Sequence, residues 1–368
     1  MDRSLRRAAL GIAAWKIVCL AFVASLSRLW PSFNLGNYAA NFHWPPDAAP
    51  SFKSLFATWD AQHFLYLSRE GYQPGALSNN FFPLWPWLIQ AAGGGLAASL
   101  LLSNFLSLIA LLLFYAHTRE TKNELLARHS LLLLLAYPGA FFLCLPFSES
   151  LFLLLVMLLF VGLAKNKISL YAPAAFLLPL CRPQGILVAV PYWYGLWRQD
   201  KKRFEHIPLW LLPLAGGAAY LFFMLHATGD AFDGLKTYRD IFPQNPSLMK
   251  MLDPVGFAKT LFEVTAWHDV RGSLLDRLWF VLFACCLPPL WKRDRLLFFY
   301  ALPMGLVPAA SLGFVSYTRH LLLVFPVFIV LAEFFEQKPP ALRWAVLSAL
   351  AAFQLYLLAR HANNFWVA

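Results

Sequence analysis

Charged residues are scarce in this chain of 368 residues: Asp, Glu, Lys and Arg make up 13% of it, whereas soluble proteins average about 25%. Hydrophobic residues make up 60%. Apolar runs of about 17–25 residues, long enough to cross a bilayer as helices, recur along the whole chain. Internal repeats and low-complexity linkers are also lacking. The sequence therefore predicts an all-α polytopic membrane protein, with one membrane domain over residues 1–368 and no separate soluble domain.

Cysteines in outer loops are lacking as well, and this argues against a disulfide scaffold or a zinc site. All the cysteines fall in apolar segments: Cys19, Cys144, Cys181, Cys285 and Cys286. The acidic residues of 227–273 show no spacing typical of metal ligands. We expect no metal and no cofactor.

Eleven membrane spans are expected, at about 8–30, 99–117, 130–146, 149–165, 168–181, 184–198, 207–226, 274–291, 295–313, 321–336 and 342–359. The net charge is +11, and 17 of the 30 Lys and Arg residues lie at the N-terminus or in short loops between spans. This positive-inside pattern favours topology signals over a nucleic-acid surface. It predicts a cytoplasmic N-terminus, an outer C-terminus, and long outer segments at about 31–98 and 227–273.

Two segments need a separate interpretation. The apolar run Ala8–Leu26 is long for a signal peptide and has no clear cleavage site, so we expect it to be the first span. Phe82–Ala92 is expected to be an interfacial or re-entrant helix that ends at Gly93-Gly94-Gly95. The chain must cross the membrane an odd number of times between the outer segment and the basic loop at Arg119, and the span 99–117 supplies one crossing.

Polar and aromatic residues are concentrated at Thr58–Trp87, an unusual composition for a membrane anchor. If the segment after Trp59 is helical, Asp60, His63 and Phe64 share one face. Asp60 can then act as a base or bind hydroxyl groups, or it can simply cap a helix. The run Phe81–Pro86 can stack on a sugar or lipid, or belong to an interfacial belt.

Three further polar clusters lie at junctions between expected spans on the same side. Glu149, after Ser148, needs a partner at the membrane edge. Arg182, followed by Gln184, can pair with Glu149 or bind phosphate. Arg319, followed by His320, can bind phosphate or extend towards the interface.

These residues stand in motifs whose order resembles the PIG-V type of mannosyltransferase, the second mannosyltransferase of GPI-anchor assembly, and its prokaryotic relatives. The motifs are WDAQHFLYLSREGY (Trp59–Tyr72), FFPLWP (Phe81–Pro86), FFLCLPFSESLFLLL (Phe141–Leu155), CRPQG (Cys181–Gly185) and, more weakly, SYTRH (Ser316–His320). The resemblance implies a GT-C glycosyltransferase with a lumenal or periplasmic active site. It also implies a polyprenyl-phosphate sugar donor, usually dolichyl- or undecaprenyl-phosphate mannose, and Asp60 as the catalytic base. The compact chain favours a prokaryotic relative, and thus the cell inner membrane, over a GPI acceptor.

On this hypothesis the enzyme transfers mannose, with inversion, to a hydroxyl of a lipid-linked or glycan acceptor. Residues expected to bind acceptor or sugar are Trp59, His63, Tyr72, Phe82, Trp85, Ser148 and Glu149, and those expected to bind the donor phosphate are Arg182, Gln184, Arg319 and His320. A monophosphate donor needs no metal clamp. The alternative is a lipid or solute transporter, which would need charges deep within several spans, where only Lys16 is found.

Overall fold

The computed structural model describes residues 2–29, 33–199, 206–241 and 253–367, with backbone alone at 28, 29 and 238–241. The named elements in these residues are all helices. Six of them are long and apolar enough to cross a membrane: α1 (Arg3–Leu29), α5 (Gly95–Thr121), α10 (Ile207–Thr228), α13 (Leu274–Arg293), α14 (Arg295–Leu312) and α17 (Pro340–Ala362). The prediction of an all-α, multi-pass membrane protein is confirmed, although the count of eleven spans is not.

Shorter helices fill the other predicted spans. They are α6 (Glu124–Ala136), α7 (Glu149–Ala164), α8 (Ile168–Cys181), α9 (Ala189–Arg198), α15 (Tyr317–Leu322) and α16 (Pro326–Glu336). Small helices form the predicted outer segments: α2 (Leu35–Ala40), α3 (Asp60–Glu70), α4 (Leu84–Ala91), α11 (Asp233–Ile241) and α12 (Pro254–Phe262).

Three spans predicted as continuous helices are interrupted, each near a proline. In the span 130–146, α6 ends at Ala136, just before Pro138, and largely irregular backbone with one short 3₁₀ helix, Ala140–Leu143, follows to Ser148. The span 184–198 begins as a 3₁₀ helix after Pro183. The span 321–336 breaks ahead of Pro326. Proline disfavours helical backbone in the residue before it, and Tyr137 and Arg182, before Pro138 and Pro183, are non-helical. Phe325 keeps helical dihedral angles, so at Pro326 the missing N–H accounts for the break.

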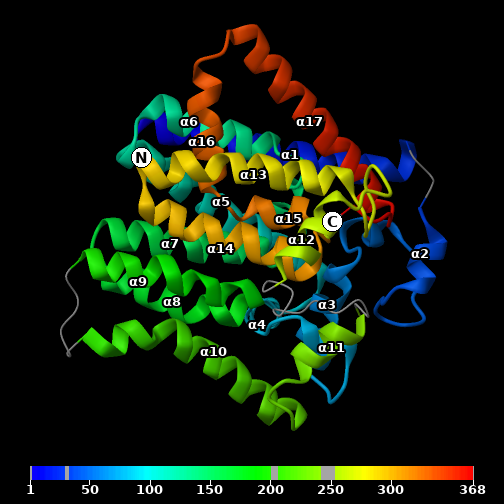
Figure 1. The fold of residues 1–368 in the computed structure, drawn as a ribbon. Coiled ribbons are helices and arrows are strands. Elements are labelled where there is room, and N and C mark those ends of the chain that lie inside the picture. The colour runs from blue at the N-terminus through cyan, green and yellow to red at the C-terminus, as the bar shows by residue number, and fades with distance from the viewer. Residues whose placement is uncertain (1, 30–32, 200–205, 242–252, 368) are drawn as a thin grey trace.

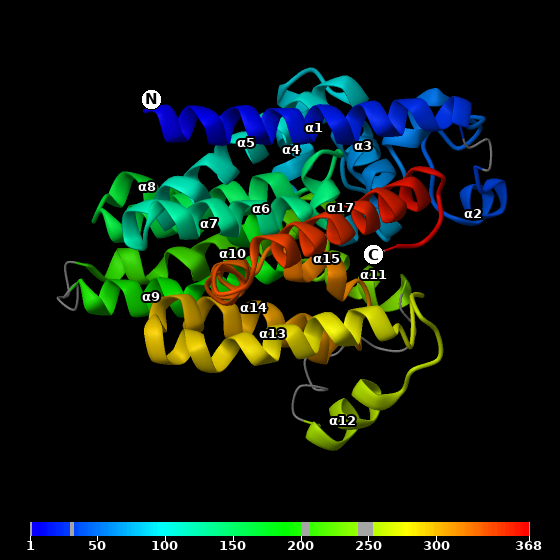
Figure 2. The same ribbon diagram turned by 90° about the horizontal axis from the view of Figure 1, so that it is seen from above.

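The basic loops and the long outer segments lie at opposite ends of the helices. Figure 1 shows the N-terminus at one end, with α2, α3, α11 and the C-terminus towards the other. At the N-terminal end the basic loops meet, since Arg119 pairs with Asp2 and Lys165 with Glu120. Figure 2 shows α1 running from this end along the molecule to the opposite end. Of the predicted basic loops, 198–203 lies largely outside the described residues.

The predicted interfacial helix is present as α4, and the glycine run after it turns the chain into α5. Gly93, Gly94 and Gly95 have φ of 96°, 73° and 79°, values that strain residues with a Cβ. Three consecutive glycines therefore allow the sharp reversal that separates α4 from the spanning helix.

The irregular segment Tyr137–Ser148 passes through the interior of the protein. It contains only one short 3₁₀ helix, Ala140–Leu143, and unpaired carbonyls are costly away from water. Lys16 of α1 donates to the carbonyl of Leu143 (3.1 Å) and to Ser107 Oγ (2.5 Å) of α5. Other side chains donate to further carbonyls of the segment: Gln354 to Tyr137, Asn104 to Cys144, Ser103 to Leu145 and Trp85 to Pro146.

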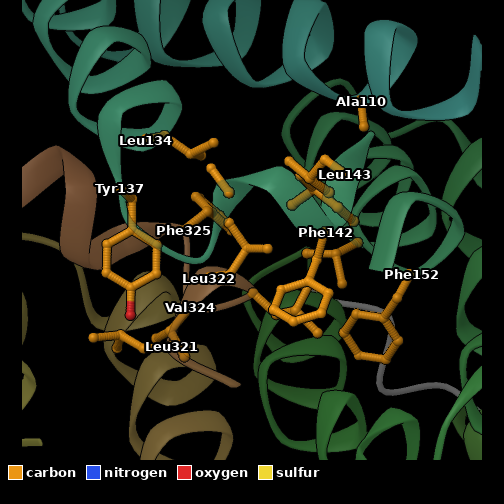
Figure 3. Close-up of a cluster of buried hydrophobic side chains, with 14 of the residues drawn as sticks. Ala110, Leu134, Tyr137, Phe142, Leu143, Phe152, Leu321, Leu322, Val324 and Phe325 are labelled. Carbon is orange, nitrogen blue, oxygen red and sulfur yellow. The ribbon is translucent and has the colours of Figure 1, made fainter. Parts of the chain in front are cut away.

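Apolar packing fixes the same segment against the break between α15 and α16. Phe142 and Leu143 lie in one buried cluster with Leu322, Val324 and Phe325 (Figure 3). Helix ends that carry polar residues are thereby brought together by the surrounding core.

Gly216 sets the approach of α10 to α8. A Cβ at Gly216 would lie 2.1 Å from the backbone oxygen of Phe176, which cannot move as a side chain can, whereas a Cβ at Gly217 would lie 3.6 Å from the tip of Ile186. We predict that Gly216→Ala lowers the free energy of unfolding by about 1–3 kcal/mol. Gly217→Ala is the control and raises it by up to about 1 kcal/mol through helix propensity. Denaturant unfolding in detergent measures both, and equal effects would contradict this packing.

Candidate functional site

Asp60 is the first residue of α3, as the helical interpretation of its motif requires. The preceding residue, Trp59, has a φ of 55°, a strained value for a residue with a Cβ. The Asp60 carboxylate accepts a hydrogen bond from Arg319 Nη1 at 2.5 Å, and its side chain is 32% exposed. Asp60 thus joins an ion pair across the fold and still faces open space.

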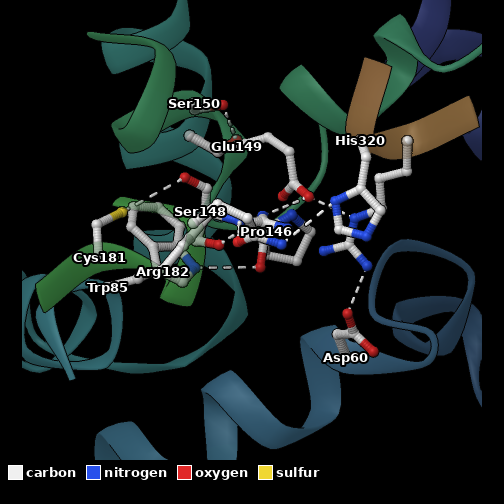
Figure 4. A network of polar contacts seen from close by, with 12 residues as sticks. Asp60, Trp85, Pro146, Ser148, Glu149, Ser150, Cys181, Arg182 and His320 are labelled. Atoms are coloured by element: carbon white, nitrogen blue, oxygen red, sulfur yellow. Dashed lines mark hydrogen bonds and ion pairs between the residues drawn. The ribbon is translucent and has the colours of Figure 1, made fainter. Parts of the chain in front are cut away.

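Glu149 lies at the centre of the site, at the start of α7 and with no exposed surface. Its Oε1 accepts from Arg182 Nη1 at 2.6 Å, and Arg319 Nε donates to the same oxygen. Arg182, Glu149, Arg319 and Asp60 therefore form a continuous row of alternating charges, which we call the charge chain (Figure 4). Of the two predicted partners of Arg182, the ion pair with Glu149 is present.

The charge chain is neutral in sum and mostly buried. Burying an ion costs several kcal/mol unless other charges and hydrogen bonds compensate, and removing one partner of a buried pair typically costs about 3–5 kcal/mol. Arg319 gains further support from the rings of Phe142 and Phe147, whose centroids lie 4.9 and 4.8 Å from its guanidinium carbon.

Polar neighbours hold Arg182 in place. Arg182 Nη1 donates to Ser148 Oγ at 3.0 Å, and Gln184 Nε2 lies 3.4 Å from His320 Nδ1. Burial, with the positive charges of Arg182 and Arg319, lowers the pKa of His320 to about 3. His320 is therefore a neutral imidazole near neutral pH. Ser148, Gln184 and His320 thus lie together with Arg182. The sequence analysis groups Gln184 and His320 with Arg182, but Ser148 with the residues for acceptor or sugar.

His63 packs between two aromatic rings. It hydrogen-bonds Ser78 Oγ at 2.8 Å and stacks between Phe42 and Phe81. No hydrogen bond joins it to Asp60 in the described structure. Burial lowers its pKa to about 4, although the charge of Asp60 opposes the shift.

The predicted aromatic residues do not line one open surface. Trp85 is fully buried and donates to the Pro146 carbonyl at 3.3 Å, so it supports the segment before Glu149. Phe82 is stacked on Tyr220, and Tyr72 donates to the Phe81 carbonyl. Trp59 meets Trp366 edge-on, and its indole N–H has no partner in the described residues. Among these aromatic residues, as the structure describes them, Trp59 combines proximity to Asp60 with a hydrogen-bonding group that has no partner.

Asp276 was missed by the sequence analysis. It is 1% exposed, and its Oδ1 accepts from both the backbone N–H and the hydroxyl of Thr318, the residue before Arg319. A signal was available, because a carboxylate within the expected span 274–291 is costly unless it is satisfied.

The chemistry available at this site follows from its charges. Asp60 is the half-exposed acidic end of the charge chain, and Glu149 Oε2 is buried without a hydrogen-bond partner in the described structure. A hydroxyl group would satisfy such an oxygen, and a carboxylate such as Asp60 can accept a proton. The described residues contain no cluster of three His, Cys, Asp or Glu side chains that could hold a metal.

Comparison with known proteins gives only distant similarities. No protein-family model and no curated protein matches the chain. One crystal structure of the Archaeoglobus fulgidus oligosaccharyltransferase, tethered with an acceptor peptide, aligns with a TM-score of 0.45 and 14% identity over 96% of this chain. Another, in complex with Zn and sulfate, aligns at 0.41 and 15% over 96%. The chain spans about half of their length, 55% and 53%. Scores this low assign no family.

The partly buried, neutral His63 makes stability depend on pH. Its unfolded pKa is about 6.5 and its folded pKa is lower, so the unfolded chain binds more protons between these values. Stability contributed by neutral His63 is complete above about pH 6.5 and is lost as pH falls towards about 4. We predict that His63→Gln makes the fall in melting temperature over this range shallower. His226→Gln, at an exposed position, is the control, and an unchanged slope in His63→Gln would refute the prediction.

Proposed function

We propose that the chain is a membrane glycosyltransferase of GT-C architecture. It transfers mannose from a polyprenyl-phosphate donor, dolichyl- or undecaprenyl-phosphate mannose, to a hydroxyl of a lipid-linked or glycan acceptor. The active site faces the periplasm or cell exterior, or the lumen in a eukaryotic cell. The observation that carries the proposal is the charge chain, in which a half-exposed carboxylate stands directly beside a buried, fixed arginine.

The proposed reaction is a single displacement with inversion. The acceptor oxygen attacks the anomeric carbon, its proton passes to Asp60, and the bond between that carbon and the donor phosphate oxygen breaks. A positioned base contributes about 10²–10⁴-fold to such a step. The donor begins as a phosphodiester with one negative charge and leaves as a lipid monophosphate with two.

The charge chain fits this change of charge. With Asp60 ionised the four side chains sum to zero, and with Asp60 protonated they sum to +1. The phosphate gains one negative charge in the same step, so the total charge of site and phosphate stays constant. Fixed positive charge facing a developing anion is the arrangement that lowers a transition state without reorganisation.

Each arginine then has its own role. Arg319 donates a hydrogen bond to Asp60. A donor phosphate that accepts from Arg319 in place of Asp60 frees the Asp60 carboxylate to act as a base. Arg182, with Gln184 and the neutral His320, forms the other side of the donor site. Glu149 keeps both guanidinium groups fixed. Its Oε2 is buried without a hydrogen-bond partner in the described structure, so only a sugar hydroxyl that enters the site beside it could satisfy it.

The rival proposal, a transporter, would rest on the charge of Lys16 within a span. The ammonium of Lys16 donates hydrogen bonds to Ser107, Asn104 and the Leu143 carbonyl. These bonds explain why a charge lies within the span, because Lys16 holds the irregular segment in place. We therefore favour the enzyme. Purified protein incubated with undecaprenyl-phosphate mannose and candidate lipid or glycan hydroxyl acceptors tests this directly. Mannosylated product supports transfer, whereas uptake into vesicles without product formation supports the transporter.

Asp60→Asn should abolish transfer, by at least about 100-fold in kcat, because the amide cannot take the hydroxyl proton. The amide oxygen can still accept from Arg319, so expression and binding of undecaprenyl-phosphate mannose should stay near wild-type. Glu70→Gln, which changes an exposed carboxylate at the end of the same helix, is the control. Near-normal turnover by Asp60→Asn would refute the assignment of the base.

Arg182→Ala should weaken binding of undecaprenyl-phosphate mannose about tenfold or more, since charge-assisted hydrogen bonds contribute about 1.5–3 kcal/mol. Arg69→Ala removes an exposed arginine of α3 and should leave affinity unchanged. Binding is measured with the protein in lipid nanodiscs. Unaltered affinity in Arg182→Ala would mean that this arginine serves only as the partner of Glu149.

A further inference from the structure

Arg319 lies on a helix that cannot fix its own position. The helix, α15, has only six residues, and short helices are marginal without tertiary contacts. Its N-cap residue, Ser316, has a φ of 57° and makes no side-chain capping bond. The position of Arg319 must therefore be set by groups outside α15.

Asp276 of α13 supplies the missing cap. Its Oδ1 accepts from the backbone N–H of Thr318 at 2.7 Å and from the Thr318 hydroxyl at 2.7 Å. The first N–H groups of a helix have no partner within it, and a carboxylate there also stabilises the helix dipole. One carboxylate thus holds both the backbone and the side chain of the residue before Arg319.

The opposite side of Thr318 is held equally closely. Tyr137 Oη donates to the Thr318 carbonyl at 2.7 Å. A Cβ at Gly139 would lie 2.9 Å from the same carbonyl oxygen, so the backbone of the irregular segment approaches α15 closely. Asp276, Thr318 and Tyr137 are all at most 2% exposed, which makes this a dry and rigid contact.

Asp276 is in turn tied to two outer segments. Its backbone N–H donates to Ser273 Oγ, and His268 Nδ1 lies 3.6 Å from its carboxylate. His268 Nε2 bonds the carbonyl of Val367 at 2.6 Å. The neighbouring Arg277 donates to the carbonyls of Thr260, Leu261 and Ser273, leaving the Asp276 carboxylate to Thr318.

We propose that Asp276 is a positioning residue for the transfer reaction, acting through Thr318 to hold Arg319 between Glu149 and Asp60. The role rests on the function proposed above. Without the bonds to Thr318, Arg319 would shift from the position in which it contacts both the Glu149 and the Asp60 carboxylates. Misplacement of a reacting group by about 1 Å can cost about 100-fold in rate.

The test compares Asp276→Ala, Asp276→Asn and Thr318→Val in lipid nanodiscs. Asp276→Ala should lower kcat about 100-fold, with a smaller effect on the KM for undecaprenyl-phosphate mannose. Asp276→Asn retains an oxygen acceptor and should recover most of the activity. Thr318→Val removes only the hydroxyl bond and should cost about fivefold. Asp294→Ala is the matched control, because Asp294 caps α14 at the opposite end of the molecule.

Amide hydrogen exchange of the peptide over 317–322 gives a readout independent of activity. It should quicken at least about tenfold in Asp276→Ala and stay unchanged in Asp294→Ala. Unchanged exchange, unchanged kcat, or a loss of activity that only follows the folded fraction and is not rescued by Asp276→Asn would overturn the proposal. If wild-type protein transfers no mannose, the proposed function fails, and the exchange result alone decides whether Asp276 positions α15.

Discussion

The site depends on one buried carboxylate that holds two arginines. Glu149 has no exposed surface, so its charge would be prohibitive without Arg182 and Arg319, and each arginine would be equally costly without Glu149. The three residues come from the start of α7, the end of α8 and the short α15. Their mutual dependence fixes how these three elements meet, and Asp60 joins the row only because Arg319 is already in place.

A second constraint makes that meeting possible. Irregular backbone is tolerated inside a membrane protein only where other groups satisfy it. The segment Tyr137–Ser148 obtains its partners from α1, α4, α5 and α17, with Lys16 among the donors. Prolines interrupt the helices and leave short helix ends inside the protein, so charged residues can converge there. The polar side chains of the spanning helices that donate to this segment are thus explained: Lys16, Ser103, Asn104 and Gln354.

Much of the architecture could be predicted from the sequence because it follows from local patterns. Apolar length located the six long spanning helices, and the glycine run located the end of α4. The breaks near Pro138 and Pro326 were missed because apolar content alone does not show where a proline removes a backbone N–H, whereas a boundary at Pro183, between the short spans 168–181 and 184–198, was expected. The Arg182–Glu149 pair was among the alternatives considered. The pairing of Arg319 with Asp60, and the burial of Trp85 and Phe82, depend on contacts between distant segments that no spacing in the sequence reveals.

The neutrality of the charge chain bears on how such a site can be both stable and reactive. An excess of arginine would attract phosphate more strongly, but unpaired cations in a buried site would destabilise the empty protein. Pairing each arginine with a carboxylate removes that cost. Under the proposed reaction the missing positive charge appears only when Asp60 takes up a proton, at the moment when the phosphate gains its second negative charge. The positive charge of the site is then larger in the transition state than in the complex with bound donor. An interaction that is stronger in the transition state than in the bound state accelerates the chemical step.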